Sequence, residues 1–309
     1  MKERVAVILG PTATGKSHCA IELAKRLNGE IISGDSMYVY RGMDIGTAKP
    51  TEAELNAVPH HLVDILPADA EFNVVDFKER AEELIKDINA RGKLPIIAGG
   101  TGLYIKALLE GYAFNSVDAD EAMRQELEQF TLEHGKEALH DRLEQLDPEA
   151  AARLHVNDTR RVIRAIEAAS KGEEINQYGA EEMPFEAVVF GLNMPREILY
   201  ERINRRVDIM IEQGLEKEVR RLLEEGVPVD CQSMKSIGYR QMLWYINDGM
   251  DYDFAVDKLK QATRNFAKRQ VTFYKRMPYI QWYELDAEPN YENVVNSMEQ
   301  TLVEKFKLV

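Results

Sequence analysis

One eight-residue segment constrains the fold of this chain more than any other. Gly10-Pro-Thr-Ala-Thr-Gly-Lys-Ser17 fits the pattern G-x-x-x-x-G-K-[ST] and joins the apolar run Val5–Leu9 to Ser17–Leu27, whose apolar residues have helical spacing. A glycine-rich turn in this position lets backbone N–H groups surround a phosphate, and the helix N-terminus adds partial positive charge. The segment therefore predicts a strand, a phosphate-binding loop and a helix in succession.

The next residues continue the alternation of strand and helix. Ile31–Ile32 and Leu94–Ala98 are short apolar runs typical of buried strands, and Asn73 suits the N-cap of a helix with apolar residues from Val74 to Ile88. Such alternation is typical of a parallel sheet with helices on both faces. We therefore expect an α/β fold, a P-loop NTPase-like parallel sheet with flanking helices.

The pattern changes near residue 115, where the strand signals stop. Ser116–Ala150 has eleven acidic and three basic residues in helical spacing, and strand character returns only at Ala187–Leu192. We therefore predict an all-helical insertion domain at residues 115–184. It would separate the two parts of a P-loop α/β core domain, residues 1–114 and 185–309.

Basic residues are concentrated in two predicted helices. One, Asp158–Lys171, lies in the insertion; the other, Phe254–Lys275, overlaps Lys258–Arg276, which has seven basic residues and no acidic one. The whole chain has 39 Lys and Arg against 53 Asp and Glu, a net charge of −14, which argues against coating of nucleic acid or a membrane but allows a local basic groove. The aromatic residues of the second helix belong either to a nucleic-acid surface or to the core.

The composition also indicates a compartment. Cys19 and Cys231 are the only cysteines, too few for a disulfide framework. No apolar run approaches the roughly 20 residues that span a bilayer, and the N-terminus has a strand pattern instead of a signal peptide. We expect a soluble cytoplasmic protein with no membrane partner.

Four side chains near predicted strand ends are candidates for the site. Lys16 would place a point charge at terminal phosphate oxygens, and the Ser17 hydroxyl would ligate Mg²⁺. Asp35 and Thr101 each follow a strand, and strand carboxyl ends face the ligand crevice in open α/β sheets. Locally, Asp35 also fits a turn residue and Thr101 a helix cap, and both alternatives stay open.

Other polar residues carry weaker signals. His60-His61 suggests a metal site, but adjacent residues do not easily aim at one ion, so a polar loop role is the favoured alternative. A long helix is expected over Arg196–Glu225, and its Arg202 and Arg206 lie among acidic residues on a face that is largely salt-bridged. We expect one of these arginines to reach the phosphates, because a leaving anion needs more than one positive charge.

Several motifs together resemble one family over nearly the whole chain, the bacterial tRNA dimethylallyltransferases, also called tRNA isopentenyltransferases. The segments that carry the resemblance are Gly10–Ser17, Asp35-Ser-Met-Tyr-Val-Tyr-Arg41, Ile45-Gly-Thr-Ala-Lys-Pro50, Pro59-His-His-Leu-Val-Asp64, Gly99-Gly-Thr-Gly-Leu-Tyr104, Asn157-Asp-Thr-Arg-Arg161 with Arg164, Gly214-Leu215 with Glu218-Val219, Ile237-Gly-Tyr239 and Lys268-Arg-Gln270. The chain departs from the family's pattern at Tyr38, where the family usually has Gln.

The resemblance implies an enzyme, a prenyltransferase that moves a dimethylallyl group from dimethylallyl diphosphate to the N6 amine of the adenine 3′ to the tRNA anticodon, with release of diphosphate. It implies Mg²⁺ as cofactor, the tRNA anticodon stem-loop as partner, base flipping to expose the amine, and a monomer. The implied catalytic residues are Asp35 as base, Thr101 and Lys16. The implied diphosphate-binding residues are Gly10, Pro11, Thr12, Ala13, Thr14, Gly15, Lys16, Ser17 and one of Arg202 and Arg206. The implied tRNA-binding residues are Asp35, Ser36, Met37, Tyr38, Thr101, Arg124, Thr159, Arg160, Arg161, Val162, Ile163, Arg164, Lys268 and Arg269.

Two other functions remain open on the residues alone. A small-molecule kinase would use the same phosphate loop, with Asp35 as base toward a hydroxyl. A non-catalytic RNA-binding NTPase would also need a basic surface. The basic stretch Lys258–Arg276 argues against the kinase, because a small substrate does not require it.

Overall fold

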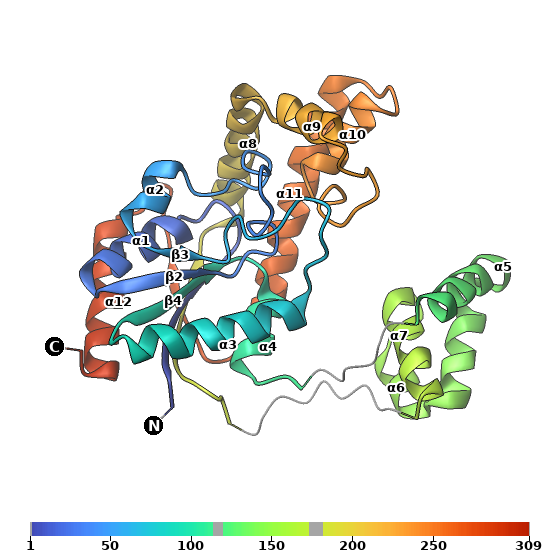
Figure 1. Cartoon of the computed structure of the whole chain (residues 1–309), viewed down its shortest axis with the longest axis horizontal. Helices are drawn as coiled ribbons and strands as arrows, with labels where there is room; N and C mark the ends of the chain where they lie inside the picture. The colour runs from blue at the N-terminus through green and yellow to red at the C-terminus, as the bar shows by residue number, and fades with distance from the viewer. Residues whose placement is uncertain (1, 114–119, 173–181, 309) are drawn as a thin grey trace. The chain divides into compact units, whose positions relative to one another are not determined.

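The structure is a computed structural model and describes residues 2–113, 120–172 and 182–308 (Figure 1). The chain divides into two compact units, Met1–Gly111 with Glu182–Val309, and Tyr112–Glu181. The predicted insertion, 115–184, differs from the second unit by three residues at each end. Within the described residues, no helix is long and apolar enough to cross a membrane.

The first unit is built on a six-stranded sheet of order β3-β2-β4-β1-β5-β6, and neighbouring strands in it pair in parallel. Its strands are β1 Arg4–Leu9, β2 Gly29–Ser33, β3 His60–His61, β4 Leu94–Gly99, β5 Glu186–Asn193 and β6 Ile280–Glu284. Leu9, the last residue of β1, pairs with Gly99 on one side and Gly191 on the other. The carboxyl ends of the central strands therefore lie at one edge, and the P-loop-like α/β prediction is confirmed.

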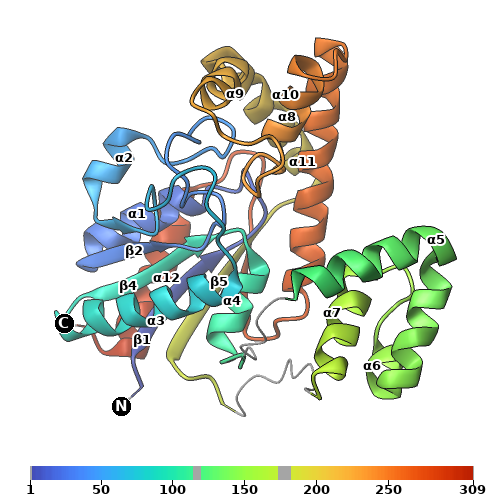
Figure 2. The ribbon, with the colours of Figure 1, turned by 45° about the vertical axis from the view of Figure 1, so that its right-hand side comes forward.

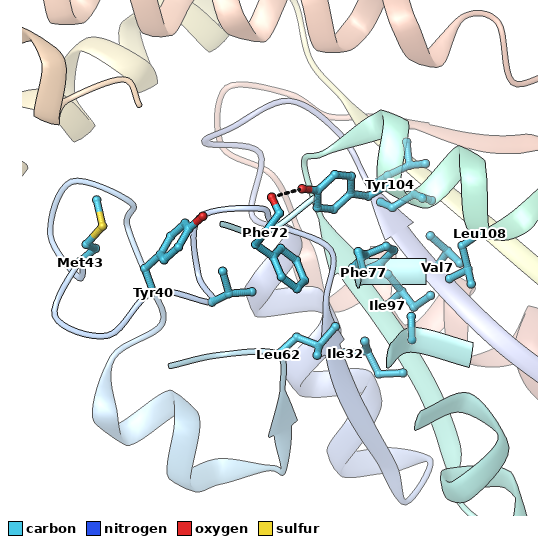
Figure 3. Close-up of a cluster of buried hydrophobic side chains, with 14 of the residues drawn as sticks. Val7, Ile32, Tyr40, Met43, Leu62, Phe72, Phe77, Ile97, Tyr104 and Leu108 are labelled. Carbon is cyan, nitrogen blue, oxygen red and sulfur yellow. Dashed lines mark hydrogen bonds between the residues drawn. The ribbon is translucent and has the colours of Figure 1, made fainter. Parts of the chain in front are cut away.

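Helices cover both faces of this sheet. The helices of the first unit are α1 Lys16–Arg26, α2 Glu52–Ala57, α3 Val74–Ala90, α4 Gly102–Leu109, α8 Arg196–Gln213, α9 Leu215–Glu224, α10 Tyr239–Ile246, α11 Tyr252–Tyr274 and α12 Tyr291–Phe306. Alternate residues of β1 enter different cores: Val7 packs with α3 and α4, whereas Ile8 packs with α1, α8 and α12. Figure 3 shows the first of these cores, in which the Tyr104 hydroxyl donates to the Phe72 carbonyl over 3.2 Å.

The structure differs from the sequence predictions at several elements of this unit. The single helix expected over Arg196–Glu225 is wrong, because Gly214 has a φ of 98° and separates α8 from α9. The short strand β3 and the C-terminal pair β6 and α12 were not predicted. Asn73 does cap α3, since its side chain accepts hydrogen bonds from the Val75 and Asp76 N–H groups.

The second unit is a helical domain with a core of its own. It contains α5 Glu121–Leu146, α6 Pro148–Arg153 and α7 Thr159–Ser170. Gly135, with φ 89° and ψ 169°, turns α5 back on itself, so α5 is a helical hairpin. Apolar residues of both arms, including Leu127 and Leu143, pack against α7. The all-helical prediction is therefore confirmed for the described part of this unit.

Candidate functional site

A cavity of about 560 Å³ lies at the carboxyl edge of the sheet. It is lined by the phosphate loop, by the turns after β2 and β4, and by side chains of α8 and α11. The lining includes Lys16, Ser17, Asp35, Thr101 and Arg206. The structure therefore brings together residues that the sequence placed at separate strand ends.

Glycines are required at two points of the phosphate loop. Gly15 has a φ of 87°, and a Cβ at this residue would come within 2.5 Å of the Tyr291 ring. A Cβ at Gly10 would come within 2.4 Å of the Leu192 carbonyl oxygen. The loop thus lies directly against β5 and α12, which limits the positions that its backbone can take.

Lys16 lies inside the cavity in a poorly solvated environment. Its Nζ donates to the Pro11 carbonyl over 2.8 Å. The pKa of Lys16 is lowered to about 7, mainly by burial and secondly by the positive charge of Arg206, and the negative charge of Asp35 partly offsets both effects. An anion in the cavity would favour the charged amine, which is the behaviour expected of a phosphate-binding lysine.

Asp35 is a turn residue and also lines the cavity. Its Oδ1 accepts a hydrogen bond from the Met37 N–H over 2.9 Å, as a turn residue does. The carboxyl group also lines the cavity, where burial raises its pKa while the Met37 N–H and Lys16 lower it. A buried carboxylate with a raised pKa is suited to accept a proton.

Thr101 holds the same turn from β4. It occupies the N-cap position of α4 but makes no side-chain cap, so the helix-cap alternative is wrong for its hydroxyl. Its Oγ1 accepts from the Ser36 N–H over 3.0 Å and donates to Ser36 Oγ over 3.3 Å. The side chain therefore fixes the residue next to Asp35.

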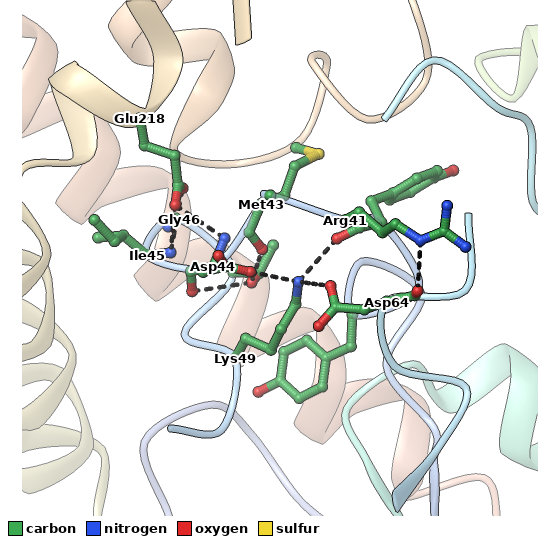
Figure 4. Close-up of polar contacts among 12 residues, drawn as sticks. Arg41, Met43, Asp44, Ile45, Gly46, Lys49, Asp64 and Glu218 are labelled. Atoms are coloured by element: carbon green, nitrogen blue, oxygen red, sulfur yellow. Dashed lines mark hydrogen bonds and ion pairs between the residues drawn. The ribbon is translucent and has the colours of Figure 1, made fainter. Parts of the chain in front are cut away.

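A carboxylate of α9 organises the loop after Tyr38 (Figure 4). Glu218 accepts hydrogen bonds from the backbone N–H groups of Asp44, Ile45 and Gly46 at 2.9–3.2 Å. It also accepts from the Tyr239 hydroxyl over 2.6 Å. Gly46 and the two residues after it line the cavity, so Glu218 shapes one of its walls, a role that sequence reasoning missed.

The same loop is held by two further side chains. Lys49 donates to the Tyr40 carbonyl over 2.8 Å and pairs with Asp44 over 2.6 Å and with Asp64 (Figure 4). The Tyr38 hydroxyl donates to the Ala48 carbonyl over 2.8 Å. Tyr38, the departure from the family pattern, therefore joins the turn that contains Asp35 to this loop.

Helix α11 contacts two glycine-rich turns at once. The Tyr274 hydroxyl donates to the Gly100 carbonyl over 2.8 Å and to the Gly10 carbonyl over 3.3 Å. The Gln270 amide donates to the Gly100 carbonyl over 2.8 Å and accepts from the Thr12 N–H over 3.1 Å. For Tyr274, which is fully buried, the core alternative is correct.

The outward side of α11 is basic. Lys268, Arg269, Phe273 and Arg276 line a shallow pocket of about 390 Å³, and the three basic residues are exposed. The Arg269 guanidinium lies 5.9 Å from the centroid of the Phe266 ring. The basic, aromatic character predicted for this helix is thus present on its surface, beside Gln270 at the cavity.

The two candidate arginines of α8 have different surroundings. Arg206 lines the cavity and its guanidinium donates to Thr12 Oγ1 over 3.3 Å. Arg202 donates from Nε to the Ala13 carbonyl over 3.0 Å and from a terminal nitrogen to the Tyr291 hydroxyl over 3.1 Å. Arg206 is therefore the one that faces the position of a ligand, whereas Arg202 is bonded to the back of the loop.

The two histidines lie away from this cavity, in β3, so the expected polar loop role is wrong. His60 donates from Nδ1 to the Val58 carbonyl and His61 donates from Nε2 to Glu30, each over 2.8 Å. Among the residues that the structure describes, no group of three or more His, Cys, Asp and Glu side chains is placed to hold a metal ion. A divalent ion bound mainly by substrate phosphates and one hydroxyl still fits Ser17, because Mg²⁺ keeps few protein ligands.

The predicted RNA-facing residues of the insertion have unequal surroundings. Arg160, Arg161 and Arg164 are exposed on α7, and Arg161 lies 3.5 Å from Asp158. Val162 and Ile163 are a correction, because their side chains pack in the domain core and present no surface to a ligand.

Arg124 makes an ion pair with another residue of the insertion. Its Nε donates over 2.8 Å to Glu167, a carboxylate that is only 2% exposed. Removing Arg124 would leave this buried charge with less compensation, so a structural ion pair accounts for the residue in the described domain.

Most of the chain matches a known family. The IPP transferase family profile matches residues 38–277. The chain belongs to the IPP transferase family. It is 45% identical to a tRNA dimethylallyltransferase of Halalkalibacterium halodurans, over 99% of this chain and all of the relative, and 48% identical to one of an Exiguobacterium species, over 99% of each.

Solved structures agree with this assignment. The chain is similar to the tRNA isopentenylpyrophosphate transferase of Bacillus halodurans, with a TM-score of 0.74, 45% identity and 99% coverage of each chain. It is also similar to a eukaryotic dimethylallyltransferase acting on tRNA, with a TM-score of 0.76, 26% identity and coverage of 97% of this chain and 78% of that one. The predicted enzyme class, a tRNA dimethylallyltransferase, is confirmed.

Proposed function

We propose that this protein transfers a dimethylallyl group from dimethylallyl diphosphate to the N6 amine of the adenine 3′ to the anticodon in tRNA. The observation that carries the proposal is the cavity that Lys16 and Asp35 share, with the phosphate loop on one side and the basic helix α11 on another. One pocket thus combines an anion site with a proton acceptor, as transfer from a diphosphate to an amine requires.

The diphosphate of the donor lies in the loop Gly10–Ser17. Lys16 and Arg206 neutralise the charge that grows on the leaving group, and the N–H groups of the loop add fixed dipoles. Mg²⁺, when bound, would supply further positive charge to the diphosphate, and Ser17 is the residue that would hold it. The lowered pKa of Lys16 in the ligand-free protein fits a lysine that becomes fully charged only with the anion.

The acceptor amine approaches the donor from the side of Asp35. The adenine nitrogen forms a bond to the first carbon of the dimethylallyl group as the bond from that carbon to the diphosphate oxygen breaks. Asp35 takes the proton that the amine loses, and Thr101 keeps the turn around Asp35 in place through Ser36. The adenine must leave the stacked anticodon loop to reach this position, at a cost of a few kcal/mol.

The tRNA is held outside the cavity by basic surfaces. We assign Lys268 and Arg269 of α11, and Arg160, Arg161 and Arg164 of the insertion, to contacts with its phosphates. Thr159, Met37 and Tyr38 remain proposed contacts. A monomer is the proposed working unit, as the family resemblance implies, and the cytoplasm is the proposed location because tRNA is present there.

The decisive experiment compares donors on one RNA. The protein is incubated with an anticodon stem-loop RNA and either dimethylallyl diphosphate or ATP, and the mass of the RNA is then measured by mass spectrometry. We expect the mass of one C5 unit to be added with the diphosphate alone. Consumption of ATP without any change in the RNA would contradict the proposal and support a kinase or an RNA-binding NTPase.

A further inference from the structure

Two side chains outside the cavity are bonded to the back of the phosphate loop. Arg202 of α8 donates from Nε to the Ala13 carbonyl over 3.0 Å, and Tyr291 of α12 donates from its hydroxyl to the Thr14 carbonyl over 3.1 Å. The two side chains are also joined to each other, because Arg202 donates to the Tyr291 hydroxyl over 3.1 Å. We call Arg202 and Tyr291 together the loop clamp.

The clamp determines where the loop N–H groups point. In a trans peptide, the carbonyl of one residue and the N–H of the next point in opposite directions. With the Ala13 and Thr14 carbonyls bonded to the clamp, the N–H groups of Thr14 and Gly15 point away from Arg202 and Tyr291. Backbone N–H groups turned inward in this way are what a phosphate loop uses to bind an anion.

The clamp is matched to the backbone of the loop. Ala13 has a φ of 69°, a conformation that a residue with a side chain adopts only when its surroundings hold it. Gly15 lies so close to the Tyr291 ring that any Cβ would collide with it. His18, one turn into α1, packs edge-on against the same ring, with 5.4 Å between ring centroids. Tyr291 therefore contacts the loop on both sides of Lys16.

We propose that Arg202 and Tyr291 are positioning residues for diphosphate binding, which act by holding the Ala13 and Thr14 carbonyls outward. The inference rests on the proposed function only in taking the loop as the diphosphate site. It assigns Arg202 and Arg206 different tasks: Arg206 meets the anion and Arg202 shapes the loop. It also gives the C-terminal helix α12 a part in donor binding.

The test measures binding of inorganic pyrophosphate and, separately, of tRNA to the full chain. Tyr291→Phe keeps the ring against Gly15 and His18 but removes the hydroxyl that makes both hydrogen bonds. We expect pyrophosphate affinity to fall about tenfold, the effect of one to two hydrogen bonds, while tRNA affinity stays unchanged. Tyr283→Phe is the matched control. The Tyr283 hydroxyl forms a hydrogen bond with Ser297 of α12, the helix that contains Tyr291, and this bond does not involve the phosphate loop.

A double-mutant cycle tests whether the clamp is one unit. Arg202→Met and Tyr291→Phe each remove one bond to the loop and also the bond between the two residues, so the loss of pyrophosphate affinity in the double variant should be smaller than the sum of the two single losses. Arg205→Met, an exposed arginine on the same helix, controls for the loss of a positive charge. If the two losses of affinity are fully additive, Arg202 and Tyr291 do not act as one unit. If Arg205→Met lowers pyrophosphate affinity as much as Arg202→Met does, the effect comes from the loss of a positive charge and not from the clamp.

The outcomes separate this inference from the proposed function. If Lys16→Ala binds pyrophosphate normally, the placement of the diphosphate is wrong and the proposed function fails with it. If Lys16→Ala loses affinity but Tyr291→Phe does not, the clamp alone is wrong. If Tyr291→Phe and Tyr283→Phe lower pyrophosphate affinity and melting temperature equally, Tyr291 only stabilises the fold and the inference is overturned.

Discussion

Lys16 and Asp35 lie in one cavity, and each favours the charged form of the other against the effect of burial. Burial lowers the pKa of the lysine and raises that of the carboxyl group, so both side chains are drawn toward their neutral forms in the ligand-free protein. A diphosphate bound beside them would favour the charged form of the lysine and the neutral form of the carboxyl group. Proton binding is therefore a direct way to follow the chemistry of the site.

Asp35→Asn should lower turnover by about 10²–10⁴-fold, because the variant has no group to accept the amine proton. Pyrophosphate affinity should not fall, since the change removes a negative charge near the anion. In the unchanged protein, turnover should be lost as pH falls through the pKa of Asp35, and this loss should occur above the pH at which an ordinary aspartate titrates. Single-turnover rates against pH provide the measurement, and near-normal turnover in Asp35→Asn would remove the residue from the mechanism.

Diphosphate binding should take up a proton at Lys16. With a pKa of about 7, this amine is largely neutral at pH 8 in the free protein and becomes charged beside the anion. Calorimetry in buffers of different ionisation enthalpy should therefore report greater uptake at pH 8 than at pH 6. Lys16→Arg, which stays charged throughout, provides the baseline for protons bound by the ligand itself. Equal uptake by the two proteins would mean that Lys16 is already charged before binding.

The same lowered pKa predicts how the ligand-free protein responds to alkali. Between about pH 7 and the ordinary pKa of 10.5, the unfolded chain binds a proton at Lys16 that the folded chain does not. The contribution of Lys16 to stability therefore increases with pH across this window and is smallest below pH 7. Denaturant unfolding of the protein and of Lys16→Met, compared over this range, measures it; parallel pH curves would contradict the shift.

Glu218→Gln should impair catalysis in addition to destabilising the fold. An amide cannot accept from all the donors that Glu218 satisfies, so the loop at Asp44–Gly46 should shift and the cavity wall with it. We expect unfolding free energy to fall by about 1–3 kcal/mol and turnover on RNA to fall about tenfold, with pyrophosphate affinity unchanged.

Glu30→Gln is the matched control for that prediction. Glu30 is also a buried carboxylate with several donors, among them Arg91, Lys93 and His61, but it lies in β2 and does not line the cavity. Its loss should lower stability to a similar extent and leave turnover of the folded protein intact. Equal losses of turnover in both variants would reduce Glu218 to a stabilising residue.

Lys268→Ala and Arg269→Ala should weaken tRNA binding in a salt-dependent way. Each lost phosphate contact should flatten the slope of log affinity against log salt by roughly 0.7–0.9. Arg220→Ala is a suitable control, because Arg220 is an exposed arginine of α9 that pairs with Glu216 over 2.8 Å. A lower melting temperature with an unchanged salt slope would contradict the proposal that these residues of α11 contact RNA phosphates.

Local patterns were sufficient for part of this site. The phosphate loop, Asp35 and Thr101 were all predicted because each follows a strand, and parallel strands bring their carboxyl ends together. The choice between Arg202 and Arg206 could not be made, because both lie on one helix and only the fold decides which one faces the cavity. The break at Gly214 was also missed, since apolar spacing continues past it.

Residues that act through distant partners were not predictable. Glu218 bonds to a loop more than 170 residues earlier, and Tyr291 to a carbonyl 277 residues earlier. Glu218 belongs to a segment that carries the family resemblance, but nothing in that segment indicates its hydrogen-bond partners, and Tyr291 belongs to no such segment. The resemblance implies an RNA contact for Arg124, and its ion pair with Glu167 could not be predicted because it forms only when α5 and α7 pack together.

The long helix α11 contacts the cavity on one side and exposes basic residues on the other (Figure 2). Gln270 and Tyr274 join its inner side to the turns at Gly10 and Gly100, while its outer side exposes Lys268 and Arg269, for which we propose contacts with RNA phosphates. We therefore predict that a displacement of this helix by one substrate would move the binding site of the other. Thermodynamic linkage then requires that tRNA change the affinity for the diphosphate by the same factor as the diphosphate changes the affinity for tRNA. Through α11, we therefore expect occupancy of either site to alter the affinity of the other.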